Sequence, residues 1–119
     1  MASEKRGRVE NKVAIVTGAA SGIGEETAVR LAEEGAAICV ADIDRDNGRR
    51  VLERIRESGG QAIFVATDIT KTAAIRRMIE RTVTAFGRLD ILHNNAIWFR
   101  HGSATESVSY THLRAHETN

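Results

Sequence analysis

Short apolar runs alternate with amphipathic helical stretches through most of this chain, and the alternation restricts the fold more than any other feature. Four runs have the length and composition of strands buried on both faces: 13–16, 37–41, 62–66 and 89–92. The stretches between them carry apolar residues at helical spacing. Strands that alternate with helices favour a parallel sheet joined by right-handed crossovers. The predicted fold class is therefore α/β.

Each helical stretch presents one apolar face and ends near a glycine. The expected faces consist of Ile23, Ala28, Leu31 and Ala32 in the first stretch, Gly48, Val51, Leu52 and Ile55 in the second, and Ile75, Met78, Ile79, Thr82, Val83 and Phe86 in the third. The second stretch is also rich in arginine. We interpret that face as solvated and balanced by Glu53 and Glu57.

Composition excludes several classes of function. With 17 basic and 16 acidic residues the formal net charge is +1, so we expect no nucleic-acid partner. No apolar run approaches the roughly 18 residues of a membrane span, and the charged N-terminus lacks the apolar core of a secretory signal. Cys39 is the single cysteine, which suits a reducing compartment and a core position. We therefore expect a cytoplasmic protein without a membrane partner.

A glycine cluster lies between the first expected strand and the first expected helix. It reads Thr17-Gly18-Ala19-Ala20-Ser21-Gly22-Ile23-Gly24. In a dinucleotide-binding loop, the first glycine permits the tight turn, the second lets the backbone approach a pyrophosphate, and the third lets the helix pack closely. The free N–H groups at the start of the helix would then face the phosphates. The alternative is a purely structural turn made of small residues.

Asp42 strengthens the nucleotide-binding interpretation. It ends the second expected strand, 18 residues after Gly24, close to the offset of about 20 residues for an acid that binds the adenosine ribose. A carboxylate there accepts hydrogen bonds from the ribose hydroxyls and repels a 2′-phosphate. NAD is therefore favoured over NADP, although Arg45 could meet a 2′-phosphate. The alternative for Asp42 is a solvated loop acid.

With these motifs in view, residues 12–97 resemble the N-terminal part of a short-chain dehydrogenase/reductase. The Thr-Gly-x-x-x-Gly-x-Gly spacing and Asp42 match that family's glycine motif and its NAD-selecting acid. Asp68 and Ile69 resemble its adenine-contacting pair, and Asn95 resembles the Asn near the cofactor ribose. The resemblance implies a Rossmann-like, doubly wound parallel sheet of order 3-2-1-4. It also implies hydride transfer between NAD and an alcohol or carbonyl substrate, in a homo-oligomeric parent protein.

The chain departs from that family in two respects. Ile97 stands where a glycine should follow Ala96. The family's catalytic Ser, Tyr-x-x-x-Lys pair and helical Asn lie further along a chain of about twice this length, so we expect the sheet to be truncated after its fourth strand. Tyr110 and Arg114 only mimic the Tyr-x-x-x-Lys pair, since Arg does not titrate as Lys does. We therefore assign no catalytic residue and no metal site, and expect a catalytically incomplete chain.

Three segments are expected on this interpretation. Residues 1–11 form a flexible N-terminus and residues 12–107 a partial NAD(P)-binding domain. Residues 108–119 form a tail whose residues 108–118 resemble one reading frame of a sequencing-library adapter, so we interpret it as an artefact. Two alternatives stay open for the whole chain. One is a short, non-catalytic NAD-binding module, and the other is a Rossmann-like methyltransferase, which also places an acid after its second strand.

Overall fold

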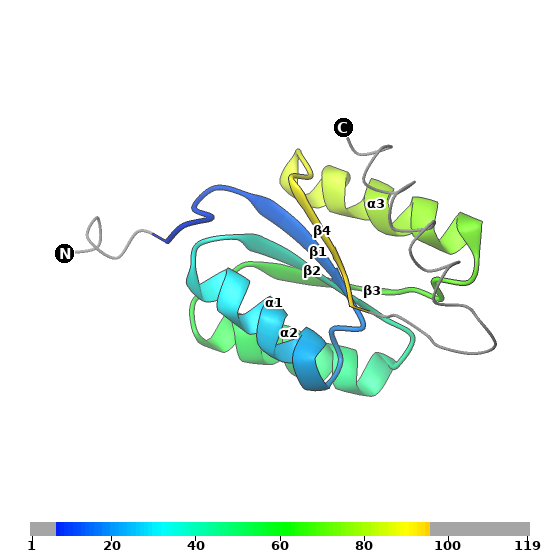
Figure 1. The fold of residues 1–119 in the computed structure, drawn as a ribbon, viewed down its shortest axis with the longest axis horizontal. Helices are drawn as coiled ribbons and strands as arrows, with labels where there is room; N and C mark the ends of the chain where they lie inside the picture. The colour runs from blue at the N-terminus through cyan, green and yellow to red at the C-terminus, as the bar shows by residue number, and fades with distance from the viewer. Residues whose placement is uncertain (1–6, 96–119) are drawn as a thin grey trace.

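The computed structural model describes residues 7–95, which form one α/β layered unit (Figure 1). Strands and helices alternate along the whole of this part of the chain. In chain order the elements are β1 (Val13–Thr17), α1 (Gly22–Glu33), β2 (Ala37–Asp42), α2 (Arg45–Glu57), β3 (Ala62–Ala66), α3 (Thr72–Phe86) and β4 (Ile91–Asn94). Within residues 7–95 no helix is long and apolar enough to cross a membrane.

The four strands form one parallel sheet in the order β3-β2-β1-β4, which confirms the predicted fold class and strand order. Val13 pairs with Ala37 of β2, and Ala14 pairs with Ile91 of β4. The chain order therefore reverses between β1 and β4. In open α/β sheets, ligands bind outside the carboxyl ends of the strands at such a reversal.

The two central strands are buried on both faces because helices cover the sheet from both sides. Figure 1 shows α1 and α2 on one face and α3 on the other. Alternate residues of β1 enter the two cores: Val16 packs on the side of α1 and α2, whereas Ile15 packs on the side of α3. Cys39 of β2 is fully buried in the second core, as predicted, and burial raises the pKa of its thiol to about 11. Period-2 alternation into two apolar layers explains why these runs lack polar residues.

Two apolar residues lie outside the faces predicted for them. Ile23 is 73% exposed, because the buried face of α1 contains Glu25, Ala28 and Val29. At 100° per residue, Ile23 lies about 200° around the helix from Glu25. Val83 is 41% exposed, at the margin of the α3 face that buries Met78 and Thr82.

The fourth strand begins two residues later than predicted, at Ile91 rather than Leu89. The cause is Asp90. Its carboxylate accepts a hydrogen bond from the Val13 N–H at 2.9 Å, and its own N–H donates to the Val13 carbonyl at 2.9 Å. Arg88 binds the same carboxylate at 2.7 Å and, as the largest cause, holds the pKa of Asp90 below its ordinary value. The acid therefore anchors the start of β4 to β1.

Part of the N-terminal segment expected to be flexible forms a hydrogen-bonded turn. Within residues 7–11, the Val9 N–H donates to the Glu34 carbonyl at 3.2 Å, and the Arg8 N–H donates to the Glu34 side chain at 3.0 Å. Val9 also packs against the core on the side of α1 and α2. Hydrogen bonds and the apolar contact of Val9 hold this turn against the end of α1. The polar composition of the segment did not indicate these contacts.

We predict that Gly48→Ala destabilises the protein, although alanine is the better helix former. A Cβ at residue 48 of α2 would lie 2.1 Å from the Phe64 ring of β3. Overpacking of this kind costs about 1–3 kcal/mol. In a Phe64→Ala background the sign should reverse, because the helix propensity of alanine then adds about 1 kcal/mol of stability. Urea unfolding of the four proteins measures both effects, and an equal effect in the two backgrounds would contradict the packing explanation.

Candidate functional site

The glycine turn joins β1 to α1 at the carboxyl edge of the sheet. Gly18 has φ 65° and Gly22 has φ 60°, left-handed conformations that glycine adopts without steric cost. Ala19 and Ala20 between them are buried. Ser21, Gly22 and Ile23 are exposed, where α1 begins. The predicted strand–turn–helix context of the motif is thus present, with the exposed side of the turn at the start of a helix.

Gly24 permits the closest approach in this region. A Cβ at residue 24 would lie 2.0 Å from the Gly18 carbonyl oxygen and 2.7 Å from the Asn95 amide nitrogen. Any side chain would therefore push α1 away from the turn. Gly24, the third glycine of the motif, therefore lets α1 pack closely against the turn and against Asn95, which follows β4.

The end of β4 is tied to the end of β1 and to the turn. The Thr17 hydroxyl donates to the Asn94 side-chain oxygen at 2.7 Å, and the Asn95 side-chain N–H donates to the Gly18 carbonyl at 3.4 Å. Thr17 and Asn94 are also partners in the β1–β4 register. The structure therefore brings Asn95 to the glycine turn, as a shared site requires. Thr17 and Asn94, whose hydrogen bond we did not predict, join the ends of β1 and β4 beside it.

Asp42 ends β2 beside the same turn. One carboxylate oxygen accepts from the Ala20 N–H at 3.0 Å, and the other accepts from the Asp44 N–H at 2.9 Å. Each oxygen has a second lone pair, so the half-buried carboxylate retains acceptor capacity for a ligand hydroxyl. Asp42 is thus held in a fixed orientation by two main-chain groups, one of them in the predicted loop.

Asp68 and Ile69 follow β3 and are half-buried. The Asp68 carboxylate accepts from the hydroxyl and the N–H of Thr70, at 2.6 and 3.0 Å, and these bonds lower its pKa. The Thr67 N–H donates to the Asp42 carbonyl at 3.0 Å, which holds this segment beside the end of β2. Asp68 and Ile69 therefore lie at the same edge of the sheet, one strand further out than Asp42.

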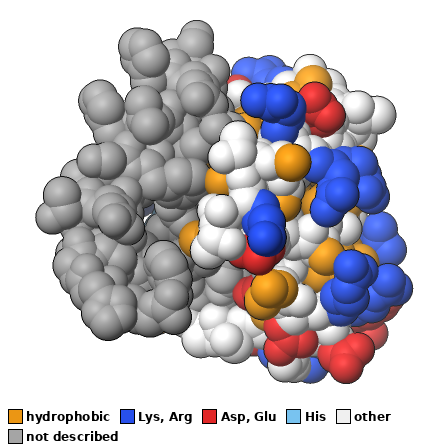
Figure 2. Space-filling model, turned by 90° about the vertical axis from the view of Figure 1, so that its right-hand side faces the viewer, with side chains coloured by type: hydrophobic (Ala, Val, Ile, Leu, Met, Phe, Trp, Pro, Cys, Tyr) orange, Lys and Arg blue, Asp and Glu red, His pale blue; other side chains and the backbone are white. Residues whose placement is uncertain are grey.

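The carboxyl edge faces the viewer in Figure 2, which is turned from Figure 1 to look onto that side. Outside the grey region, basic side chains gather along one side of this face, and acidic side chains lie at its lower edge and among the basic ones. Within residues 7–95 there is no group of three or more His, Cys, Asp or Glu side chains that could hold a metal ion. The polar groups described at this edge are thus hydrogen-bonding groups from the turn and the strand ends.

The arginines of α2 are exposed, as expected, but the prediction that Glu53 and Glu57 balance them is wrong for two of them. Arg50 and Arg54 instead bind Glu25 of α1, at 2.8 and 2.7 Å. Hydrogen bonding from Arg50, the largest cause, holds the pKa of Glu25 below its ordinary value although burial acts in the opposite direction. The spacing of residues along α1 could have indicated this contact, because Glu25 lies on the same helix face as the buried Ala28 and Val29.

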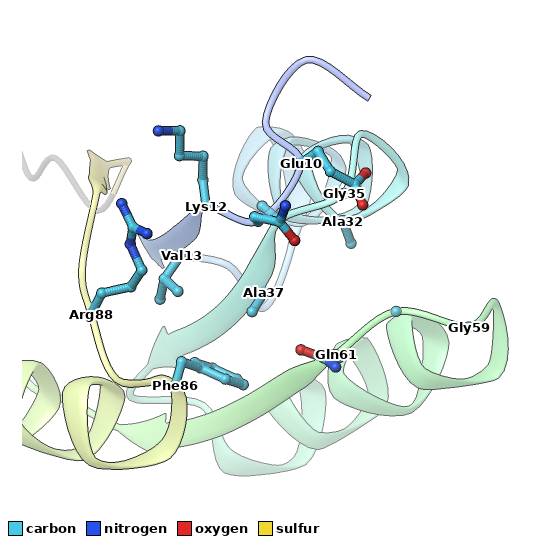
Figure 3. A pocket seen from close by; sticks show the side chains of 13 residues that line it. Glu10, Lys12, Val13, Ala32, Gly35, Ala37, Gly59, Gln61, Phe86 and Arg88 are labelled. Carbon is cyan, nitrogen blue, oxygen red and sulfur yellow. The ribbon is translucent and has the colours of Figure 1, made fainter. Parts of the chain in front are cut away.

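A hollow of about 440 Å³ lies at the opposite, amino-terminal edge of the strands (Figure 3). Phe86, from the end of α3, and Gln61, before β3, face the same space, whereas Lys12 points away from them. None of the sequence-predicted site residues lines it. The candidate site is therefore the carboxyl edge.

A doubly wound sheet with a glycine turn, an acid after β2 and an asparagine after β4 is typical of nucleotide-binding α/β proteins, and the fold is Rossmann-like. The family model for short chain dehydrogenases matches residues 12–115. The chain belongs to this family, which argues against the methyltransferase alternative. The match continues past residue 107, so it does not mark the boundary that we expected there.

Individual relatives agree with this assignment. The chain is 42% identical over 95 residues to the (2S)-((R)-hydroxy(phenyl)methyl)succinyl-CoA dehydrogenase subunit BbsD of Thauera aromatica, covering 80% of this chain and 38% of that protein. A hydroxysteroid dehydrogenase from Escherichia coli superposes with a TM-score of 0.75 at 35% identity, covering 87% of this chain and 46% of that one. A 7 alpha-hydroxysteroid dehydrogenase complexed with NADH and 7-oxo glycochenodeoxycholic acid gives 0.70 at 38% identity, covering 71% and 33%. The chain therefore spans less than half the length of each.

We predict that Gly24→Ala costs roughly 3 kcal/mol of stability, because the new methyl group meets a main-chain carbonyl that cannot rotate away. Gly22→Ala is the matched control. Its Cβ would meet nothing within 4 Å, so only the left-handed φ penalty of about 1 kcal/mol applies. Thermal or urea unfolding compares the two proteins. Equal losses of stability in the two variants would contradict the explanation that the close approach of α1 to the turn requires glycine at residue 24.

We predict that Glu25→Gln lowers the unfolding free energy by about 1 kcal/mol at pH 7, since both arginine partners are half exposed to screening water. The folded-state pKa of Glu25 is lowered. The ionised carboxylate therefore stabilises the fold above its unfolded pKa of about 4.3, and this contribution disappears as the pH falls through the folded pKa.

Urea unfolding of both proteins between pH 7 and about pH 3 measures the change, and the difference between them should shrink toward the acid end. Glu26→Gln is the control, because the Glu26 side chain is 69% exposed and, within residues 7–95, its ion pair is with Arg54 alone. A difference for Glu25→Gln that is independent of pH would contradict the ion-pair explanation.

Proposed function

We propose that this chain is the N-terminal, cofactor-binding part of an NAD-dependent short-chain oxidoreductase. The observation that carries this is the convergence at one sheet edge of the Gly18–Gly24 turn, Asp42 and Asn95, joined by the hydrogen bonds described above. Exposed main-chain groups of Ser21, Gly22 and Ile23 at the start of α1 would bind the pyrophosphate, since a helix N-terminus favours an anion. The NADH complex of a relative with 38% identity supports a nicotinamide cofactor.

We assign the remaining predicted residues to the adenosine half of the cofactor. Asp42 would accept hydrogen bonds from the ribose hydroxyls, and Asp68 with Ile69 would border the adenine, one strand further out. Asn95 would lie near the cofactor ribose, on the β4 side of the turn. Because a carboxylate repels a 2′-phosphate, NAD is the proposed cofactor rather than NADP.

The proposed reaction is hydride transfer between NAD and an alcohol or carbonyl substrate in a homo-oligomeric parent protein of the cytoplasm. The hydroxysteroid dehydrogenases among the related structures support this substrate chemistry. Residues 7–95 contain no tyrosine, the residue that we expect to act as acid and base on the substrate oxygen. We therefore assign cofactor binding, and no catalytic residue, to this part of the chain. A chain that binds NAD without turnover would also fit the non-catalytic module.

We predict that the protein binds NAD⁺ at least about tenfold more tightly than NADP⁺ and that Asp42→Asn narrows this ratio. Asparagine keeps one oxygen for the Ala20 N–H or the Asp44 N–H but removes the charge that repels a 2′-phosphate. Isothermal titration calorimetry with both cofactors measures the ratio.

Asp46→Asn serves as the control, because Asp46 is an exposed acid in the first turn of α2 and its loss tests for a general charge effect. The ratio should stay at the wild-type value in this variant. Failure of the wild-type protein to bind either dinucleotide would overturn the proposed function. Equal shifts for the two variants would overturn the role of Asp42.

A further inference from the structure

A closed ring of hydrogen bonds joins the glycine turn, the end of β2 and the first turns of α2. The Ala20 N–H donates to Asp42, whose other oxygen accepts from the Asp44 N–H. The Asp44 carboxylate accepts from the main chain and the side chain of Asn47, at 3.1 and 2.8 Å. Asn47 accepts from Nε of Arg50 at 3.3 Å, and Nη2 of Arg50 donates to the Ala20 carbonyl at 3.3 Å. The ring thus begins and ends on the two polar groups of one residue, Ala20.

The ring restrains Ala20 from two directions. Asp42 holds its N–H from the sheet, and Arg50 holds its carbonyl from α2. Ala20 is 2% exposed, whereas the next residues, Ser21 and Gly22, are exposed at the start of α1. Fixing the Ala20 carbonyl fixes the plane of the peptide that it shares with Ser21, because the peptide unit is planar. The first exposed N–H of the turn therefore takes its direction from Arg50.

Glu25 holds Arg50 in the geometry that this contact needs. Its two oxygens accept from Nη2 and Nη1 of Arg50, at 2.8 and 3.1 Å. Such a two-pronged pair restricts a side chain that would otherwise sample many rotamers. The Arg50 side chain is 53% exposed, so packing alone does not fix it. All three nitrogens of the guanidinium donate hydrogen bonds, each within α1, α2 or the turn.

Arg54 provides an internal comparison one helical turn away. Its Nη1 binds Oε2 of Glu25 at 2.7 Å, the oxygen that also accepts from Nη1 of Arg50. The Arg54 side chain is 44% exposed, similar to that of Arg50. Its other partner is Glu26, at 3.2 Å, on the outer side of α1. Arg54 therefore joins α1 to α2 through the same acid as Arg50 but has no contact with Ala20 among those described. Both arginines therefore hold α1 against α2, but of the two it is Arg50 that also contacts the turn.

We infer that Arg50 is a positioning residue for the dinucleotide: held by Glu25, it orients the Ala20–Ser21 peptide of the glycine turn for the cofactor pyrophosphate. This role rests on the cofactor binding proposed above, and Arg50 acts through the turn rather than by touching the cofactor. Asp42 contributes from the opposite side, so the acid proposed for the ribose and the turn proposed for the pyrophosphate belong to one hydrogen-bonded unit.

The test compares Arg50→Met with Arg54→Met in the full 119-residue chain. Both changes remove one ion pair to Glu25 and keep an unbranched side chain, so both should lower the unfolding midpoint similarly. Only Arg50→Met should weaken NAD⁺ binding, by about tenfold in calorimetric titration, with Arg54→Met remaining within about twofold. Arg50→Lys, a milder variant, keeps the charge without the planar fork and should weaken binding by a smaller factor.

Hydrogen exchange of the free protein supplies a readout that does not require the cofactor. The amides of Ala19, Ala20 and Glu25, which donate hydrogen bonds in or beside the turn, should exchange about tenfold faster in Arg50→Met and at the wild-type rate in Arg54→Met. Equal effects of the two variants in titration or in exchange would overturn the inference, because helix docking alone would then explain them. A wild-type protein that binds no dinucleotide would contradict the proposed function, while the exchange result would still decide whether Arg50 positions the turn.

Discussion

The approach of α1 to the Gly18 carbonyl is the constraint on which the rest of the site depends. Residue 24 has no room for a side chain, since a Cβ would lie 2.0 Å from that oxygen. The same carbonyl accepts the Asn95 amide. One main-chain oxygen of the turn therefore sets how close the helix comes to the turn and where the end of β4 can lie. A larger residue 24 would separate both partners from the turn at once.

The site is assembled from strand ends rather than from any single segment. Four parallel strands deliver their carboxyl ends to one edge, so Thr17, Asp42, Thr67 and Asn94 come together although the chain separates them widely. The Thr17 and Asn94 side chains bind each other, whereas Asp42 and Asn95 bind main-chain groups of the glycine turn. Such bonds satisfy polar groups that the apolar strands could not accommodate, and they transmit the geometry of the sheet to the turn.

Sequence patterns were sufficient for the fold because its determinants are local and repeated. Apolar runs identified the four strands and the β–α alternation predicted that they are parallel, whereas the family resemblance implied their order. The start of β4 was missed because Asp90 looked compatible with a strand, whereas its carboxylate takes a main-chain hydrogen-bond partner from β1. Ile23 was misassigned because it lies in the first turn of α1, where an apolar residue need not share the buried face.

The site was predicted only in part, for a different physical reason. Gly18, Gly24 and Asp42 follow from spacing along the chain and Asn95 from the family resemblance, and hydrogen bonds and close packing join them in the structure. Glu25 and Arg50 were missed because each is an ordinary charged residue on a helix, and their relation arises only when α1 and α2 pack side by side. Contacts between helices that are distant in the chain have no signature in the periodicity of either one.

The bonds that complete the turn also determine when it can form. The bonds from Thr17 to Asn94 and from Asn95 to Gly18 each join residues 77 positions apart. Loop-closure entropy makes such distant pairings late events in folding, after the neighbouring strand and helix contacts have formed. During synthesis the turn leaves the ribosome with the first strand, yet it has no partner on its β4 side until the last described strand follows. The glycine turn is thus made before β4 and gains its β4 partner only after β4 has followed.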